Sequence, residues 1–128
     1  MKKALGVVLS ITMLLAMSVN SFAANLGNTP YGVFCGYSSW TGSGSTKAYT
    51  TQTDTERKPP KLRHTYYVNN YATGASVVGS TKKETTTSNK INSTSKSLPS
   101  SPQVKGVTAH ECIGTGTSSW GGTTSVVF

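Results

Sequence analysis

Few side chains in this chain could perform acid–base, nucleophilic or metal chemistry, and they are widely spaced. The sequence contains two cysteines, two histidines and four carboxylates: Cys35, Cys112, His64, His110, Asp54, Glu56, Glu84 and Glu111. Glycoside hydrolysis needs two carboxylates that flank one bond, but Asp54 and Glu56 stand in a hydrophilic linker. No Gly-x-Ser-x-Gly elbow occurs near a histidine, and the sequence contains no glycine-rich loop for binding phosphate.

The sequence therefore predicts a protein that is not an enzyme and that uses no cofactor. A secreted hydrolase remains the third possibility, because the many serines could complete a Ser-His-acid arrangement. Zinc is not predicted, because a structural zinc site takes about four close ligands. The chain offers only its two cysteines and two histidines for that purpose.

The two cysteines admit a structural and a chemical interpretation. A reactive thiol is the chemical one, and the neighbours His110 and Glu111 of Cys112 would then matter. A single pair in an exported chain favours a disulfide instead. Closing a loop of roughly 80 residues would stabilise the fold by about 4 kcal/mol. We expect a bridge between Cys35 and Cys112, with Cβ atoms within about 4.5 Å of each other.

Basic residues cluster in the middle of the chain. Arg57, Lys58, Lys61 and Arg63 surround Pro59 and Pro60. Such a cluster is either ordinary solvated surface or a site for an anionic surface. Outside a bacterium the available polyanions are phospholipids, teichoic acids and the pyrophosphates of lipid-linked wall precursors. Nucleic acid is not predicted as a partner, because export separates the protein from it.

A short sequence recurs after each cysteine. Gly36-Tyr-Ser-Ser-Trp-Thr-Gly42 is echoed by Gly116-Thr-Ser-Ser-Trp-Gly-Gly122. The echo is either chance in a chain rich in serine and glycine, a pair of related strand–turn units, or two loops whose tryptophans form one aromatic platform. On the third interpretation, Trp40 and Trp120 join the four basic residues as the candidate envelope-binding set.

The N-terminus has the pattern of a signal peptide. Lys2 and Lys3 precede an apolar run from Ala4 to Val19, and Ser21-Phe22-Ala23 places small residues at −3 and −1 of a cleavage site. The run is shorter than the ~20 residues that span a bilayer. We expect residues 1–23 to be removed, leaving 24–128 as one secreted domain with no membrane span. Without Lys2 and Lys3, ten Lys and Arg residues stand against four Asp and Glu residues, a net charge of about +6.

The composition of residues 24–128 predicts an all-β fold. Ser, Thr, Gly and β-branched residues disfavour helices and favour short strands joined by turns. We expect a small β-sandwich of short antiparallel strands, with at least five strands and no helix longer than about two turns. The predicted strands cover 31–37, 47–53, 62–69, 75–78, 104–113 and 118–128, the last two forming a hairpin.

Three segments depart from this pattern. Residues 24–30 are a polar lead-in, and 54–61 cannot be a central strand because its prolines lack N–H donors. Residues 81–101 are either a pair of solvent-facing strands or a mobile loop. Within 62–69, alternation places Leu62, His64, Tyr66 and Val68 on one face.

The motif Tyr31-Gly-Val-Phe-Cys-Gly-Tyr-Ser-Ser-Trp40, followed by Gly44-Ser-Thr-Lys-Ala-Tyr-Thr50, resembles the N-terminal part of lactococcin 972-type bacteriocins. The resemblance covers about twenty residues, and the cysteine pair and Trp40-Thr-Gly-Ser43 depart from the family pattern. It implies a secreted antibacterial β-sandwich that binds the lipid-linked wall precursor and blocks septum assembly without forming pores. An immunity protein would then be a further partner. The alternative is a secreted structural or adhesive protein of the envelope or matrix.

Overall fold

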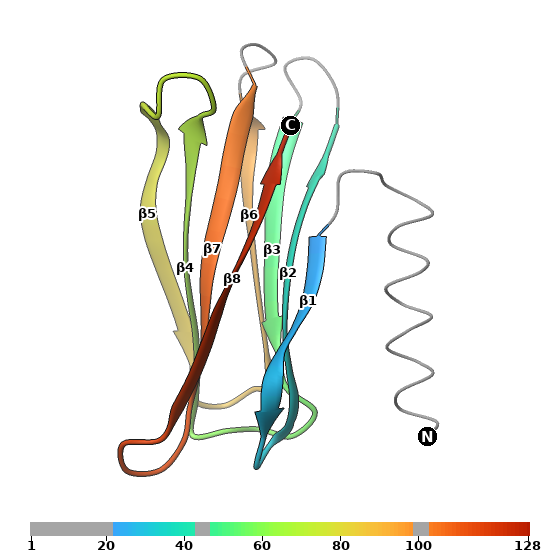
Figure 1. The fold of residues 1–128 in the computed structure, drawn as a ribbon, viewed down its shortest axis with the longest axis vertical. Coiled ribbons are helices and arrows are strands. Elements are labelled where there is room, and N and C mark those ends of the chain that lie inside the picture. Colours follow the sequence, from blue (N-terminus) through green and yellow to red (C-terminus); the bar gives the residue numbers. More distant parts are fainter. Residues whose placement is uncertain (1–21, 43–46, 99–102) are drawn as a thin grey trace.

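The computed structural model describes residues 22–42, 47–98 and 103–128. These residues form eight strands (Figure 1), and each strand pairing is antiparallel. The strands are β1 (Phe22–Thr29), β2 (Gly32–Thr41), β3 (Lys47–Asp54), β4 (Lys61–Asn70), β5 (Ser76–Thr85), β6 (Lys90–Leu98), β7 (Val104–Ile113) and β8 (Ser119–Val127). The all-β prediction is confirmed. None of the described segments is a helix long and apolar enough to cross a membrane.

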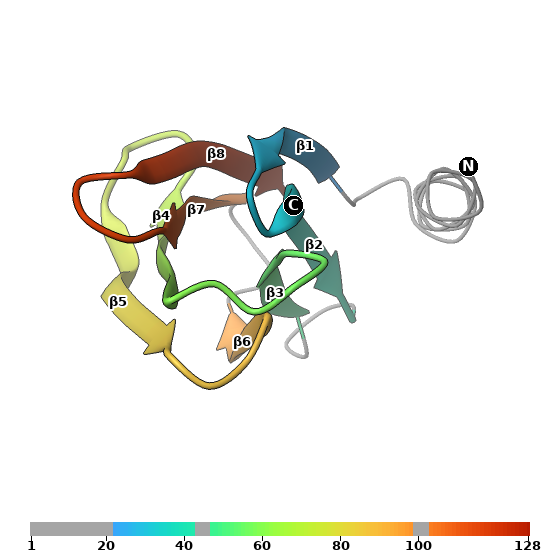
Figure 2. The same ribbon diagram turned by 90° about the horizontal axis from the view of Figure 1, so that it is seen from below.

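The strands make two four-stranded sheets that face each other (Figures 1 and 2). Sheet A has the order β1-β2-β3-β6, and sheet B has the order β5-β4-β7-β8. The upper end of Figure 1 contains the β4–β5 turn and Phe128. The lower end contains the connections from β3 to β4, from β5 to β6 and from β7 to β8.

Alternation along β4 behaves as predicted. Leu62, His64, Tyr66 and Val68 are buried between the sheets, and Tyr67 faces outward and is exposed. The expected hairpin is also present, because β7 and β8 pair from Lys105↔Val127 to Ile113↔Ser119. Gly116 in its turn has a φ of +67°, which glycine adopts without steric cost.

One segment differs from the prediction, and another decides between two alternatives that the sequence left open. Residues 24–30 were predicted to be a lead-in, but most of them belong to β1, which pairs with β2 along an edge of sheet A. An edge strand can be polar, and Leu26 is the side chain that anchors this one to the interior. Residues 81–98 are strands rather than a loop: they lie in the largely exposed β5, in β6, whose Ile91 and Leu98 are buried, and in the turn that joins them. The predicted signal peptide falls mostly on residues 1–21, which are outside the described ranges.

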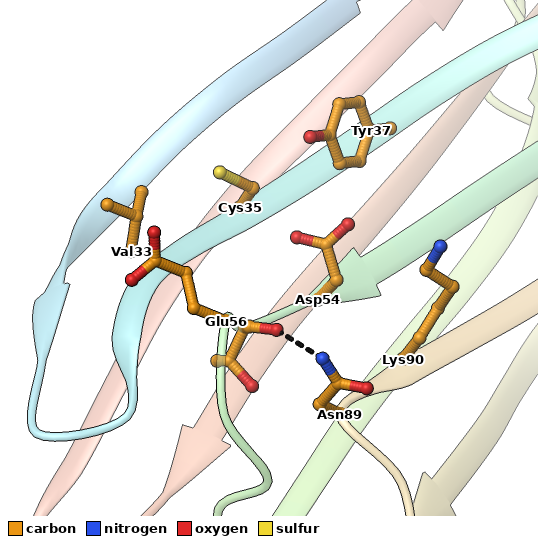
Figure 3. A pocket seen from close by; sticks show the side chains of 8 residues that line it. Val33, Cys35, Tyr37, Asp54, Glu56, Asn89 and Lys90 are labelled. Carbon is orange, nitrogen blue, oxygen red and sulfur yellow. Dashed lines mark hydrogen bonds between the residues drawn. The ribbon is translucent and has the colours of Figure 1, made fainter. Parts of the chain in front are cut away.

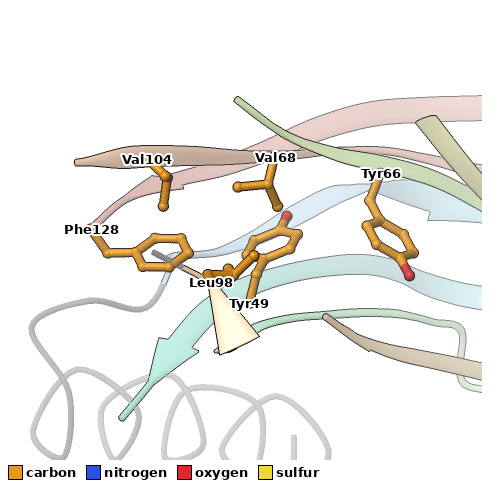
Figure 4. Packing of buried hydrophobic residues seen from close by; sticks show 6 residues of the cluster. All are labelled: Tyr49, Tyr66, Val68, Leu98, Val104 and Phe128. Carbon is orange, nitrogen blue, oxygen red and sulfur yellow. The ribbon is translucent and has the colours of Figure 1, made fainter. Parts of the chain in front are cut away.

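The interior has an apolar cluster toward each end. The upper cluster contains Tyr49, Tyr66, Val68, Leu98, Val104 and Phe128 (Figure 4). The rings of Tyr49 and Phe128 stack with centroids 6.3 Å apart. The lower cluster contains Phe34, Leu62, Ile91 and Cys112. Aromatic rings thus supply much of the buried apolar area, as the scarcity of aliphatic residues requires.

The predicted disulfide is wrong, since Cys35 and Cys112 are both free and buried. Strand alternation explains why. Phe34 points between the sheets, so the next residue, Cys35, points to the outer face of sheet A, where it lines a pocket. Cys112 points inward and packs in the lower cluster. The two thiols therefore lie on opposite faces of sheet A.

We expect the purified protein to contain two free thiols per chain and to be insensitive to reductant. Its melting temperature with and without dithiothreitol should agree, whereas loss of a long-loop disulfide would cost about 4 kcal/mol. Because both thiols are buried, alkylation should be slow in buffer and complete in denaturant. A melting temperature that falls on reduction would contradict this arrangement.

Candidate functional site

The two histidines meet inside the molecule, around one threonine. His64 and His110 have no exposed surface. The Thr53 hydroxyl lies 3.0 Å from His64 Nδ1 and 2.6 Å from His110 Nδ1. Strand register explains the meeting, because His64 on β4 is directly opposite His110 on β7 and Thr53 comes from the facing sheet.

Hydrogen bonds extend from these rings through the whole interior, and we call the set the histidine network. His64 Nε2 lies 2.8 Å from the Ser93 hydroxyl, and His110 Nε2 lies 2.7 Å from the Thr124 hydroxyl. The chain then continues from Thr124 to Ser38 (2.6 Å), to the phenol of Tyr49 (2.8 Å) and to Thr108 (2.6 Å). The network crosses between the sheets and reaches the upper cluster at Tyr49.

Counting protons shows which charge state this network favours. A hydroxyl and a neutral imidazole each carry one proton to donate, so donors can follow one direction and satisfy every bond. If both rings were charged, Thr53 would face two N–H donors and its own proton would lose its acceptor in the network. Burial and then Lys83 lower the pKa of His64 to about 4. Burial and then His64 lower the pKa of His110 to about 3.

The histidines are therefore neutral at neutral pH and inaccessible to a substrate in solvent. A general acid or base must come within hydrogen-bond reach of the proton that it transfers. Instead, the two rings share a hydrogen-bond partner from the facing sheet, and they thereby connect the two sheets. The network is a structural feature of the interior and contributes no external catalytic site.

A pocket of about 260 Å³ lies on the outer face of sheet A near its lower end (Figure 3). Cys35, Tyr37 and Asp54 line it together with Asn89 and Lys90. Burial, and next the Asp54 charge, raises the pKa of Cys35, and burial likewise raises the pKa of Asp54. The thiol is thus protonated and a poor nucleophile at neutral pH.

The polar groups of this pocket mostly bond to their own neighbours. Gln52 Nε2 donates to Asp54 Oδ2 at 2.7 Å. Asn89 Nδ2 donates to the Thr55 carbonyl at 2.7 Å, the dashed line of Figure 3. Within residues 22–42, 47–98 and 103–128, no group of three or more His, Cys, Asp or Glu side chains could hold a metal ion. The pocket therefore presents neither an activated nucleophile nor a ligand set.

The structure divides the predicted basic cluster into two unlike pairs. Arg57 and Lys58 lie exposed in the lower loop between β3 and β4. Arg57 Nη2 donates to the Pro30 carbonyl at 2.9 Å, and Lys58 Nζ donates to the Thr86 carbonyl at 3.2 Å. Neutral carbonyl partners hold these side chains in place without cancelling their charge.

Lys61 and Arg63 instead face acidic side chains across the outer surface of sheet B. Arg63 Nη2 lies 2.6 Å from Glu111 Oε2, and its Nε donates to Glu111 Oε1 at 3.3 Å. Lys61 and Arg63 also lie 3.8 and 3.9 Å from Glu84. The fork of a guanidinium suits such a two-point contact. Half of the predicted cluster is thus locally neutralised.

The tryptophans do not form one platform. Trp40 stacks on Phe128 at 5.3 Å in the upper part of the molecule, with Lys47 Nζ 5.6 Å from the Trp40 ring. Trp120 packs edge-on against Tyr31 at 6.4 Å, beside the lower cluster. Both side chains are half-buried. The two repeats occupy different positions on β2 and β8, so their tryptophans lie toward opposite ends.

A second pocket, which sequence analysis missed, lies at the upper end on the outer face of sheet B. We call it the tyrosine pocket. It encloses about 230 Å³ and is lined by Tyr67, Asn69, Asn70, Tyr71, Gly74, Lys105 and Val107. The outward position of Tyr67 in the β4 alternation was a usable signal. The contribution of β7 was not predictable, because it depends on register between distant strands.

Acidic side chains lie toward one end only, whereas basic side chains lie at both ends, with Arg57, Lys58, Lys61, Arg63, Lys82, Lys83 and Lys90 in the lower half. Asp54 ends β3, Glu84 and Glu111 lie near the ends of β5 and β7, and Glu56 follows β3. All four acidic side chains of the chain therefore lie in the lower half. Lys96 and Lys105 lie in the upper half, near the end of β6 and the start of β7.

At the upper end, Lys105 and the exposed Tyr67 and Tyr71 thus line one pocket to which no carboxylate contributes. Comparisons with protein-family models, with curated proteins and with solved structures found no match for this chain.

Proposed function

We propose that this chain is an exported, basic β-sandwich that acts like a bacteriocin. It binds the anionic cell envelope or a lipid-linked wall precursor of related bacteria and catalyses no reaction. The observation that carries the proposal is the distribution of acidic residues: every acidic side chain lies in the lower half, whereas Lys105 lines a pocket at the upper end together with the exposed Tyr67 and Tyr71.

Distance keeps the charge at the upper end from being cancelled. Lys105 and Glu111 lie on the same strand, six positions apart, which is about 20 Å at the rise of a β-strand. Screening at physiological salt acts over about 8 Å, so the carboxylates of the lower half have little effect at Lys105. An anionic surface attracts each nearby basic residue by about 1 kcal/mol.

The interior supports binding over catalysis. Both histidines are fully buried in a satisfied hydrogen-bond network, and the pKa of the buried Cys35 thiol is raised. The groups best able to activate a substrate are thus protected or inactive. The surface groups near the upper end are cationic and aromatic.

Binding of the purified protein to Gram-positive cells should fall steeply as salt rises from about 50 to 500 mM, because contacts between exposed charges are screened. Growth of a susceptible relative should be inhibited in the same low-salt range. Cell sedimentation with a fluorescently labelled protein measures the first and broth dilution the second. Absent or salt-insensitive binding, with no inhibition of any close relative, would rule the function out.

The alternative is a structural or adhesive role in the envelope or matrix. Strands β5 and β6 are edge strands of their sheets, and nearly all side chains of β5 are exposed. Exposed edges can pair with further chains. Concentration-dependent assembly without growth inhibition would favour this role.

A further inference from the structure

The tyrosine pocket has an exposure pattern that the fold does not require. Among the described residues, the exposed large hydrophobic side chains are Tyr67, Tyr71 and Val77, with 37%, 56% and 38% of their surface accessible. Two of these three line one pocket. Tyr49 and Tyr66 show that tyrosine side chains can be buried in this aromatic-rich core. Exposed aromatic rings beside a pocket are typical of ligand recognition.

The pocket is held in shape by its turn. Asn70 Oδ1 accepts hydrogen bonds from the N–H groups of Ala72 and Thr73, both at 3.0 Å. The N–H of Asn70 donates to the Ala75 carbonyl at 2.8 Å, and the N–H of Tyr71 donates to the Gln103 carbonyl at 2.9 Å. Tyr71 is thus fixed by its backbone while its ring stays in solvent. A preformed site loses little entropy when a ligand binds.

The polar groups of the pocket are suited to an uncharged or anionic partner. Lys105 lies directly across from Asn69 in the β4–β7 ladder, and both line the pocket. The amide of Asn69 can both donate and accept hydrogen bonds, whereas the Lys105 ammonium only donates. A cationic ligand would meet Lys105 without a compensating carboxylate.

We propose that the tyrosine pocket binds one sugar ring of a bacterial glycan. The C–H groups on one face of a pyranose carry partial positive charge and stack on the electron-rich face of a tyrosine ring. Its hydroxyl, acetamido or carboxylate substituents then bond to Asn69 and Lys105. A volume of about 230 Å³ is below the ~300–1,000 Å³ of sites for drug-sized ligands, so it suits a single ring of a longer chain.

This inference deepens the proposed function by naming the ligand class at the upper end, and it rests on that function for the source of the glycan. A membrane surface is a poorer occupant, because the apolar lining is limited to two tyrosine rings and Val107. Extended lipid insertion would need a larger apolar patch.

Titration with a soluble tetramer of N-acetylglucosamine, followed by two-dimensional NMR, tests the proposal. Shifts should concentrate on residues 67–74 and 105–107, with a dissociation constant on the order of 1 mM for a single open subsite. Y67S and Y71S should each weaken binding at least tenfold, while Y71F, which keeps the ring, should bind as the wild type does. V77S is the matched control, because Val77 is equally exposed but does not line the pocket.

The outcomes of this titration can be distinguished from the outcomes of the cell-binding test of the proposed function. No shifts at 10 mM tetramer, or tenfold-weaker binding in V77S as well as Y71S, would overturn the sugar site. Salt-dependent cell binding by the wild-type protein would still stand in that case. The dispersion of the NMR spectrum of each variant shows whether it is folded. If Y67S does not fold, Y71S still tests the proposal, because Tyr71 lies exposed at a turn.

Discussion

Acidification from pH 7 to pH 4 is expected to unfold this protein or bring it close to unfolding. The folded-state pKa values of His64 and His110, about 4 and about 3, lie below the ordinary value of about 6.5. Above pH 6.5 neither state binds a proton at these rings. Below it the unfolded chain takes up protons that the folded chain refuses, so stability is lost as pH falls.

The expected loss is large. Each histidine reduces the free energy of unfolding by about 1.4 kcal/mol per pH unit in this window, or roughly 3 kcal/mol by pH 4. Small domains have a total stability of about 5–15 kcal/mol, and two histidines therefore remove much of it. Asp54 acts in the opposite sense, because its raised pKa makes the folded carboxyl bind a proton more readily.

Urea unfolding followed by tryptophan fluorescence at pH 7, 6, 5 and 4 measures this effect. The double variant H64Q/H110Q is the control, because glutamine retains a donor and an acceptor but does not titrate. It should be less stable at pH 7 and much less dependent on pH from 6.5 to 4. Equal stability of the wild-type protein at pH 7 and pH 4 would contradict the neutral, buried network.

Adding one methyl group at Gly36 or Gly106 should destabilise the fold severely. A Cβ atom at Gly36 would lie 2.6 Å from His110 Cδ2, and one at Gly106 would overlap the ring of Tyr49. Both rings belong to the histidine network and cannot move without breaking its hydrogen bonds. Overpacking typically costs about 1–3 kcal/mol, and a broken buried hydrogen bond adds about 1–3 kcal/mol.

G36A and G106A should therefore each lower the free energy of unfolding by several kcal/mol, as measured by chemical denaturation. G79A provides the matched control on an exposed strand, because nothing lies within 4 Å of its added Cβ. Its stability should change by less than about 0.5 kcal/mol. If G36A and G79A proved equally stable, the close contact between β2 and the His110 ring would be wrong.

The sequence pattern predicted those strands in which buried and exposed side chains alternate. In β4 the apolar and polar positions alternate clearly, so its faces could be assigned from sequence alone. In β1 the pattern is weak, because an edge strand needs only Leu26 to reach the interior. The two prolines of the β3–β4 loop gave a correct boundary, since they cannot donate to a sheet.

The features that depend on register could not be predicted. The sequence separation of Cys35 and Cys112 is compatible with a disulfide, but the direction of one side chain decides whether the two sulfur atoms can meet. The meeting of Thr53 with two histidines likewise requires the facing of two sheets. The neutralisation of Lys61 and Arg63 follows from pairing with β5 and β7, which the spacing of charges along β4 does not reveal.

The most direct measurement of envelope binding compares three double variants that each remove two positive charges. They are K96Q/K105Q at the upper end, R57Q/K58Q in the lower loop and K61Q/R63Q beside Glu84 and Glu111. The dissociation constant for anionic lipid vesicles and for Gram-positive cells is measured at 50 mM salt, with folding checked by melting temperature. We predict the largest loss for K96Q/K105Q, about 30-fold at ~1 kcal/mol per charge. Equal losses in all three variants, or a larger loss in K61Q/R63Q, would contradict binding through the upper end.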